Sequence, residues 1–441
     1  MNGFLPAAVR WKDLDPDGRR ALLRRPAQST AAEVDQTVLE IIARVRREGD
    51  RAVLDLCLEH DRVRLESLRV AEDEAAAAAG GLSDEQRQAV RRAIANVRRF
   101  HEAQRPQALR VETAPGVICE RVSVPIDAVG LYVPAGSAPL PSSAVMLAVP
   151  ALLAGCRRVV LCSPPRGDGR LDPGVLFAAQ ECGVTEIYKV GGAQAIAAMA
   201  YGTHTIPKVE KIFGPGNAWV TAAKLQVAAD PEGAAYDMPA GPSEVMVVAD
   251  ETADPDFIAA DLLAQAEHSP DAQAVLVAAC PRLIPEVVRA LAAQLDRLTR
   301  VGIARAALAN SRLIEVEDLE TAIGVANQYA PEHLILQLSE PRSWLSGLRT
   351  AGSVFLGPWT PEAMGDYCSG TNHVLPTYGY ARAHSGLSLG SFMREMTIQQ
   401  ISAEGLQGLG PTAVTLAMME GLDAHAASVS ARLDKLAGRT T

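Results

Sequence analysis

Apolar residues recur with the spacing of a helix face over the first quarter of the chain. Val38, Ile41, Ile42 and Val45 lie one to three positions apart, and similar spacings continue further along. Apolar residues three and four positions apart form one side of an amphipathic helix. The pattern predicts that residues 31–110 are mainly helical.

The pattern changes at residue 117. The segment 117–133 is rich in β-branched residues and precedes Pro134, which is typical of a strand or a hairpin. Helical and strand patterns then alternate. Predicted strands cover residues 158–163, 186–190, 209–213, 244–249, 272–279, 334–338 and 352–357, and predicted helices cover 142–155, 173–182, 192–201, the residues after Gly216, 254–267, 282–299 and 318–329. Such alternation is typical of parallel sheets covered by helices, so we expect two similar α/β units.

The last eighty residues carry a different pattern. Residues 358–390 are rich in Gly, Pro, Thr, Ser and Tyr, which makes this segment too long and too polar for an ordinary connection and predicts a functional loop. A helical tail is predicted from residue 391. The chain is thus expected to divide into a helical section (1–116), a first α/β domain (117–238), a second α/β domain (239–390) and a helical tail (391–441).

Composition excludes several classes of protein. The chain has 441 residues, a net charge of −10, 48% hydrophobic and 21% charged residues, so it is not a disordered or fibrous chain. Its longest apolar stretch, residues 144–155, contains Pro150 and is shorter than the about twenty residues of a membrane span. The N-terminus lacks the features of a signal peptide. We expect a cytoplasmic protein without a membrane partner.

Composition also disfavours a nucleic-acid partner, disulfide bonds and a cysteine zinc site. Basic residues of the first part alternate with apolar ones as on solvated helix faces, and aromatic residues make up only 4% of the chain, which leaves few platforms for stacking nucleic-acid bases. The seven cysteines never form a CxxC pair, so reduced thiols are expected instead of disulfides or a cysteine zinc site. We expect no nucleic-acid partner.

Two glycine-rich junctions could bind a cofactor. VGGAQA (190–195) and FGPGNAW (213–219) each join a predicted strand to a helix, where small residues let backbone N–H groups approach an anion. Ligands of α/β proteins gather beyond the carboxyl ends of strands. Gln194 and Asn217 could then hydrogen-bond a nicotinamide or ribose. The second junction reads G-x-G-x-x-W, with Trp219 where a small residue is usual, so a tight structural turn stays an alternative.

Four polar groups could carry chemistry. They are Gln265 with His268, Glu332 with His333, Asp366 with His373, and Glu420 with His425. The first pair shares a helix face and could hold a metal, although a polar helix end would look the same. The second could supply an acid and a base, although exposed loop charges are an ordinary alternative.

Taken together, these segments resemble the histidinol dehydrogenase family from about Arg44 to the tail. The motifs appear in the family's order: YVPAG (132–136), KVGGAQAIAAMAYGT (189–203), FGPGN (213–217), DMPAGPSE (237–244), QAEH (265–268), YAPEHL (329–334), GDYCSGTNHVLPT (365–377) and EGL followed by His425. The resemblance implies two incomplete Rossmann-like parallel-sheet domains in an aldehyde-dehydrogenase-like architecture. It also implies a homodimer with shared active sites, the helical tail being exchanged.

The resemblance further implies an activity and a set of site residues. The reaction would be the zinc-dependent oxidation of L-histidinol through L-histidinaldehyde to L-histidine, the last steps of histidine biosynthesis, with two NAD reduced. One zinc per subunit would be held by Gln265, His268, Asp366 and His425, the last from the other subunit. Substrate would contact Ser243, Gln265, His268, His333, Asp366, His373, Glu420 and His425, and NAD would contact Tyr132, Gln194 and Asn217. Glu332 and His333 would be the catalytic pair: His333 would take the alcohol proton, and Glu332 would activate water.

Two other functions fit parts of this pattern. A relative could oxidise another small polar alcohol, such as a sulfonated diol, but His373, Glu420 and the NHVLPT loop are intact. A catalytically silent zinc-binding or metabolite-binding protein would not need both Glu332 and His333. Ser269, where Gly or Asp is usual in the family, and the looser match over 389–402 touch none of the implied roles, and Cys368 is expected to be a bystander.

Overall fold

The structure is a computed structural model that describes residues 6–25, 31–135 and 138–439. It divides into two compact units: unit 1 contains Met1–Gln104 and Asp127–Ser391, and unit 2 contains Arg105–Ile126 and Phe392–Thr441. Within the described ranges, none of the helices has the length and apolar character needed to cross a membrane. The domain boundaries expected at residues 116, 238 and 390 stay a prediction.

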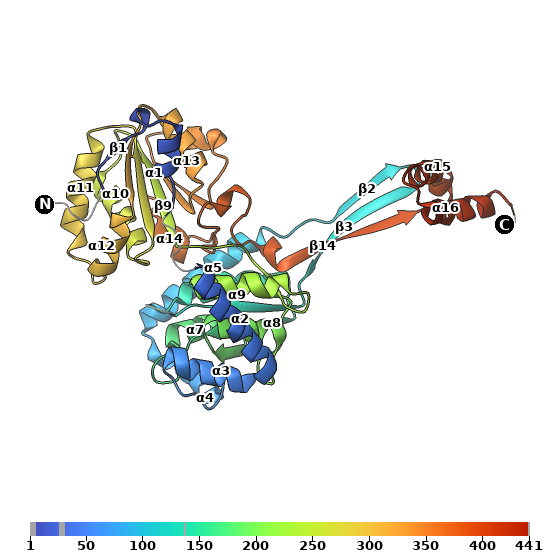
Figure 1. The fold of residues 1–441 in the computed structure, drawn as a ribbon, viewed down its shortest axis with the longest axis horizontal. Helices are drawn as coiled ribbons and strands as arrows, with labels where there is room; N and C mark the ends of the chain where they lie inside the picture. The colour runs from blue at the N-terminus through green and yellow to red at the C-terminus, as the bar shows by residue number, and fades with distance from the viewer. Residues whose placement is uncertain (1–5, 26–30, 136–137, 440–441) are drawn as a thin grey trace. The chain divides into compact units, whose positions relative to one another are not determined.

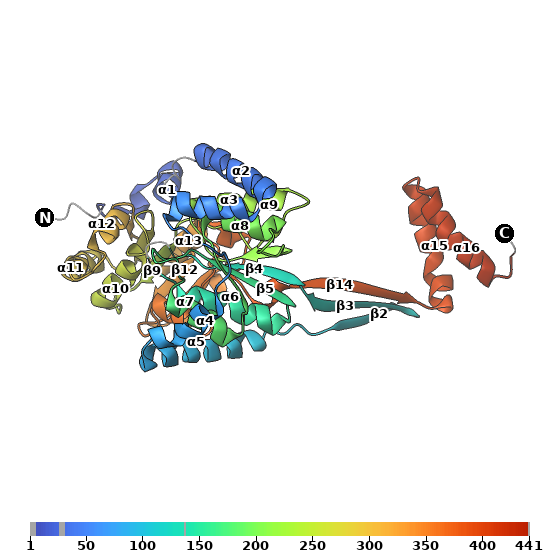
Figure 2. The ribbon, with the colours of Figure 1, turned by 90° about the horizontal axis from the view of Figure 1, so that it is seen from below.

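The first sheet of unit 1 has five parallel strands in the order β6-β5-β4-β7-β8. The strands are β4 (Ala128–Tyr132), β5 (Arg158–Ser163), β6 (Glu186–Lys189), β7 (Lys211–Phe213) and β8 (Ala235–Tyr236). Its helices are α2 (Ala31–Glu48), α3 (Asp50–Leu56), α4 (Glu72–Ala77), α5 (Asp84–Glu102), α6 (Pro141–Ala154), α7 (Pro173–Cys182), α8 (Gly192–Tyr201) and α9 (Ala218–Ala229). Helices α2, α3, α8 and α9 cover one face, and α5, α6 and α7 cover the other (Figure 2).

The second sheet of unit 1 has six parallel strands in the order β1-β11-β10-β9-β12-β13. They are β1 (Val9–Arg10), β9 (Glu244–Ala249), β10 (Gln273–Ala278), β11 (Arg312–Glu315), β12 (His333–Gln337) and β13 (Ser353–Leu356). The helices are α1 (Pro16–Leu22), α10 (Pro255–Ala266), α11 (Leu283–Leu295), α12 (Val301–Ala309), α13 (Leu319–Tyr329) and α14 (Glu362–Tyr367). Alternate residues of β9 enter separate cores, one beneath α10, α11 and α12 and one beneath α13 (Figure 1). Strands buried on both faces have continuous apolar sequences, and β9 reads EVMVVA.

Both parallel sheets share one topology. Without the short β1, each follows the order third, second, first, fourth, fifth along the chain. This order reproduces five of the six strands of the doubly wound dinucleotide-binding fold. The prediction of two incomplete Rossmann-like units is confirmed.

Unit 2 is a three-stranded antiparallel sheet joined to two helices (Figure 1). Its strands are β2 (Leu109–Ala114), β3 (Val117–Pro125) and β14 (Met393–Ile401), and its helices are α15 (Ala403–Met419) and α16 (Asp423–Leu436). The prediction of a helical tail from residue 391 is therefore wrong over residues 393–401, which form β14. All but one residue of β14 are exposed in the chain, so the strand has no buried face to impose an alternating apolar pattern.

The remaining differences from the expected elements are local. The segment 117–133 forms two strands, but β3 and β4 belong to different sheets, so it is not a hairpin. The helix expected over 282–299 ends at Leu295, and α12 and β11 occupy a stretch where no element was predicted. Short 3-10 or π segments cover Trp11–Asp13, Cys57–Asp61, Ala78–Gly81, Pro341–Gly347, Tyr380–Arg382 and Leu389–Phe392.

Candidate active site

A cavity of about 450 Å³ in unit 1 collects residues from both parallel sheets. Pro134 and Gly214 line it just beyond the carboxyl ends of β4 and β7. Ser243 and Glu332 also line it, but they directly precede the amino ends of β9 and β12. The cavity therefore lies beyond strand carboxyl ends in the first sheet and at strand amino ends in the second.

Helix ends give the two sides of the cavity opposite polarity. Ser143, in the first turn of α6, and Asn217, which precedes α9, line the side formed by the first sheet. His268, just past the end of α10, lines the side formed by the second. Helix N-termini carry partial positive charge and C-termini partial negative charge. The cavity thus favours an anionic group on one side and a cationic group on the other.

Glu332 and His333 are buried and are held by the backbone of one residue. The Glu244 N–H donates to Glu332 Oε2 at 2.9 Å, and the Glu244 carbonyl oxygen lies 3.2 Å from His333 Nδ1. Because a carbonyl only accepts, this contact places the proton on Nδ1. His333 Nε2 lies 3.3 Å from Asp366 Oδ1. The second ring nitrogen, Nε2, therefore faces the Asp366 carboxylate.

Local sequence explains why this pair sits at a strand start. Ala330 ends α13 in the left-handed conformation, with φ of 56°, and Pro331 cannot continue a helix. The chain then enters β12, whose His333 pairs with Val245 of β9. That register brings His333 beside Glu244.

Three carboxylates surround the His333 ring. Glu362 Oε1 and Glu332 Oε2 each lie 3.6 Å from Nδ1, and Asp366 lies at Nε2. Burial lowers the pKa of His333, but the carboxylates of Glu362, Glu332 and Asp366 raise it well above its usual value. Burial raises the pKa of Glu332 to about 7 and that of Glu362 to about 8. The cluster can therefore hold and exchange protons near neutral pH.

A donor set suited to a metal lies next to this cluster. Donor atoms of His268, Glu362 and Asp366 all lie within 4.8 Å of one another. Gln265 is fully buried, and neither its amide oxygen nor its amide nitrogen has a hydrogen-bond partner. An unpaired buried amide is costly unless something binds it. Imidazole, carboxylate and amide oxygen together fit a borderline cation such as zinc.

Glu362 is the residue that sequence reasoning missed. It lies four positions before Asp366, one turn away on the same short helix, and both its carboxylate oxygens are buried without a hydrogen bond. An acidic pair at this spacing shares a helix face. That spacing was the available signal.

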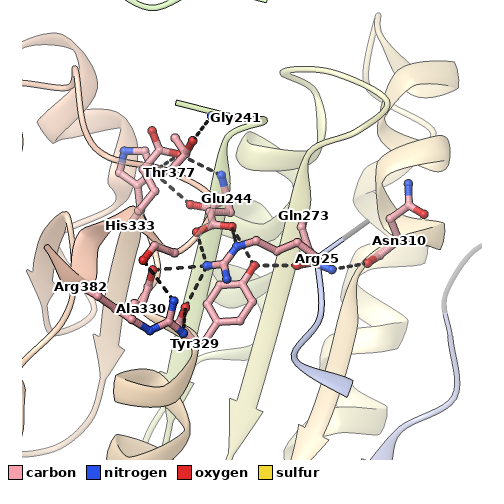
Figure 3. Close-up of polar contacts among 12 residues, drawn as sticks. Arg25, Gly241, Glu244, Gln273, Asn310, Tyr329, Ala330, His333, Thr377 and Arg382 are labelled. Atoms are coloured by element: carbon pink, nitrogen blue, oxygen red, sulfur yellow. Dashed lines mark hydrogen bonds and ion pairs between the residues drawn. The ribbon is translucent and has the colours of Figure 1, made fainter. Parts of the chain in front are cut away.

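His373 is fixed by its neighbours. Its Nδ1 lies 2.7 Å from the Asp366 carbonyl oxygen and its Nε2 lies 3.1 Å from Ser143 Oγ. Burial lowers its pKa. The flanking loop is pinned as well, because the Gly241 N–H donates to Thr377 Oγ1 (Figure 3). The loop that was expected to be functional thus places Asp366 and His373 at the cavity.

The residues expected to contact a dinucleotide are only partly at the cavity. Asn217 lines it and caps α9, its Oδ1 accepting from the Val220 N–H at 3.2 Å. Tyr132 and Gln194 are buried and are not among its lining residues. The Tyr132 hydroxyl accepts from the Gly192 N–H at 3.0 Å, at the start of α8. Trp219 is 39% exposed, which explains why a large residue is tolerated there.

The last two predicted residues belong to unit 2. Glu420 follows α15, His425 lies in the first turn of α16, and both side chains are exposed. In unit 1, by contrast, the structure brings seven of the predicted residues to one cavity: Asn217, Ser243, His268, Glu332, His333, Asp366 and His373.

Comparisons with known proteins agree over nearly the whole chain. The family model for histidinol dehydrogenase matches residues 23–433. A histidinol dehydrogenase of Vibrio parahaemolyticus is 55% identical over 97% of this chain and 98% of its own, and one of Xanthomonas campestris is 56% identical over 96% and 98%. The crystal structure of histidinol dehydrogenase from Elizabethkingia anophelis matches with a TM-score of 0.93 and 44% identity, over 96% of this chain and 97% of that one. The chain therefore belongs to the histidinol dehydrogenase family.

Proposed function

We propose that this enzyme oxidises L-histidinol through L-histidinaldehyde to L-histidine, with zinc bound and two NAD reduced. The observation that carries the proposal is the buried Glu332–His333 pair, whose side chains contact the Glu244 backbone. The unpaired Gln265 amide and the group of metal donors support it further. As a step of amino-acid biosynthesis, the reaction is proposed to take place in the cytoplasm.

Gln265, His268 and Asp366 are the proposed zinc ligands of this chain. The fourth, His425, is proposed to come from a second copy, with Glu362 as a further carboxylate close by. When bound, zinc would hold the imidazole and amine of the substrate and so orient its alcohol carbon. The C-terminal end of α10 at this side of the cavity supports a cationic ligand.

His333 is proposed to act as the base and Glu332 to activate water. With Nδ1–H donated to the Glu244 carbonyl, Nε2 of the neutral ring can take the alcohol proton while hydride leaves the same carbon. Glu332 then takes a proton from a water molecule that adds to the aldehyde carbon. Protonated His333 gives its proton to the aldehyde oxygen as the water adds, and the hydrate so formed gives a proton back to His333 as it loses the second hydride. Glu332 and His333 then release their protons to solvent. NAD, when bound, accepts one hydride in each oxidation.

NAD is proposed to bind on the first-sheet side of the cavity. Tyr132, Gln194 and Asn217 lie at or near the starts of α8 and α9, where backbone N–H groups favour a pyrophosphate. The chain carries a net charge of −10, so these backbone groups would do more to hold the cofactor than any basic patch. Ser243, His373 and Glu420 are proposed to orient the substrate.

A homodimer with shared sites is proposed as well. Unit 2 carries Glu420 and His425 and exposes many large apolar side chains, including Val111, Ile398, Ile401, Leu416, Met418 and Met419. Such surfaces mark protein interfaces. A second copy of the chain is the proposed partner.

One assay tests the activity. L-Histidinol and excess NAD are added to zinc-loaded protein, and the NADH formed is counted. We expect about two NADH per histidinol, since the conversion of an alcohol to an acid removes two hydrides. One NADH or none rejects the proposal, and removal of zinc by a chelator should abolish the signal.

A further inference from the structure

A buried ion pair joins the N-terminal segment to the start of β9. Arg25 Nε lies 2.5 Å from Glu244 Oε2, and Arg25 Nη2 lies 2.6 Å from Oε1, although the two residues are 219 positions apart. Their side chains are 9% and 2% exposed. Figure 3 shows the guanidinium lying between Glu244 and Tyr329.

The guanidinium also holds the end of α13. Its Nη2 donates to the carbonyl oxygens of Tyr329 at 2.9 Å and Ala330 at 3.3 Å, and its carbon lies 3.9 Å from the centre of the Tyr329 ring. The Tyr329 hydroxyl lies 3.0 Å from Glu244 Oε2. Arg25 thus ties together the start of β9 and the chain that leads into β12.

These two segments are the ones that place the proposed catalytic pair. The Glu244 N–H and carbonyl contact Glu332 and His333 respectively, and Ala330 lies two residues before Glu332. Any movement of the Glu244 backbone would therefore change its contacts with both side chains. Among the residues that the structure describes, the Arg25 guanidinium has no hydrogen bond or ion pair with either of them.

We propose that Arg25 is a positioning residue for the oxidation, acting through Glu244 to set the orientation of Glu332 and His333. The inference rests on the proposed function of that pair. Without the guanidinium, the Glu244 carboxylate would be left buried and unpaired, which a structure avoids by moving the group or protonating it. A shift of about 1 Å in a reacting group can cost about 100-fold in rate.

The alternative is that the Arg25–Glu244 ion pair only stabilises the fold. Buried ion pairs are weak evidence for stability, because apolar replacements often do as well. The N-terminal segment has other anchors as well: Trp11 is buried, β1 pairs with β11, and Arg312 Nε donates to the Leu22 carbonyl at 3.3 Å. Arg25 is thus not the sole attachment of this segment.

The test compares Arg25→Ala and Arg25→Lys with Arg46→Ala. Arg46 is the control, although its side chain is more exposed. It also pairs with two carboxylates at 2.7 Å and lies 4.3 Å from the ring of Tyr201, and it belongs to α2, which covers the first sheet. We measure kcat, KM for histidinol and NAD, zinc content and thermal unfolding. For Arg25→Ala we expect kcat to fall about 10- to 100-fold, with both KM values and zinc content unchanged, and millimolar guanidinium to restore part of the loss.

Arg25→Lys keeps the charge but loses the forked geometry, so its kcat should also fall, even if Arg25→Ala does not fold. Arg46→Ala should keep wild-type kcat. An unchanged kcat in Arg25→Lys, or a loss in Arg25→Ala that guanidinium does not relieve, overturns the positioning role. Wild-type protein assayed alongside separates the two proposals, because a wild type that forms no NADH rejects the proposed function instead.

Discussion

At the scale of single residues, Glu332 and His333 are neighbours with different environments. The His333 ring donates from Nδ1 to a carbonyl and directs Nε2 toward Asp366, whereas Glu332 accepts one N–H at Oε2. Burial raises the pKa of Glu332 to about 7, so it can exchange a proton with water near neutral pH. These differences suit an alcohol base and a water-activating carboxylate.

The proposed division of labour predicts unequal losses in two variants. His333→Asn removes the base of both oxidations, so both steps should slow by about 100- to 10,000-fold. Glu332→Gln should slow oxidation of the aldehyde more than oxidation of the alcohol, because only the aldehyde step needs a water nucleophile. NADH formation is measured separately from histidinol and from histidinaldehyde. Equal losses in both steps of Glu332→Gln would contradict the assignment.

At this scale, the sequence could reveal only residues that lie close together along the chain. Glu332 and His333 stand side by side in the chain, and Gln265 and His268 share a helix face. Their anchor, Glu244, lies 88 positions from Glu332, and Arg25 lies a further 219 positions away from that anchor. Contacts across such separations leave no local pattern, so the support of the pair could not be predicted from the residues alone.

At the scale of elements, strands buried on both faces were predictable and exposed strands were not. β9 and β10 read as apolar runs because all their residues are buried. β14 is exposed along its length, and its pairing with β3 spans more than 260 positions. The cavity at the amino end of β12 does not follow from the general preference for strand carboxyl ends, since the amino ends of one sheet line the same cavity as the carboxyl ends of the other.

Gly214 shows how tightly the ends of β4 and β7 fit. Its φ is 126°, and a Cβ built there would lie 2.1 Å from the Tyr132 carbonyl oxygen. Gly214→Ala should therefore lower the unfolding temperature and raise KM for NAD, because β4 and the turn before α9 must separate. The matched control is Gly324→Ala in α13, where nothing lies within 4 Å and alanine should add about 0.5–1 kcal/mol of stability. Gly214→Ala with wild-type stability and KM would contradict this fit.

At the scale of the whole molecule, the proposed site draws on both units of the fold. Unit 1 contains Glu332, His333 and three metal donors, whereas His425 belongs to unit 2. The apolar residues exposed on unit 2 favour burial against another chain. An exchanged unit would complete the site of one subunit with His425 from the other.

Sharing of sites between subunits predicts that two inactive variants restore each other. His333→Asn and His425→Ala should each reduce NADH formation to about 1% of wild type or less when expressed alone. In a dimer that contains one of each, the subunit with intact His333 would receive intact His425 from its partner, so one of its two sites is whole. Random assembly after co-expression should then give about a quarter of wild-type activity. If each site is built from a single chain, every site in the mixture carries a lesion, and activity stays at the level of the single variants.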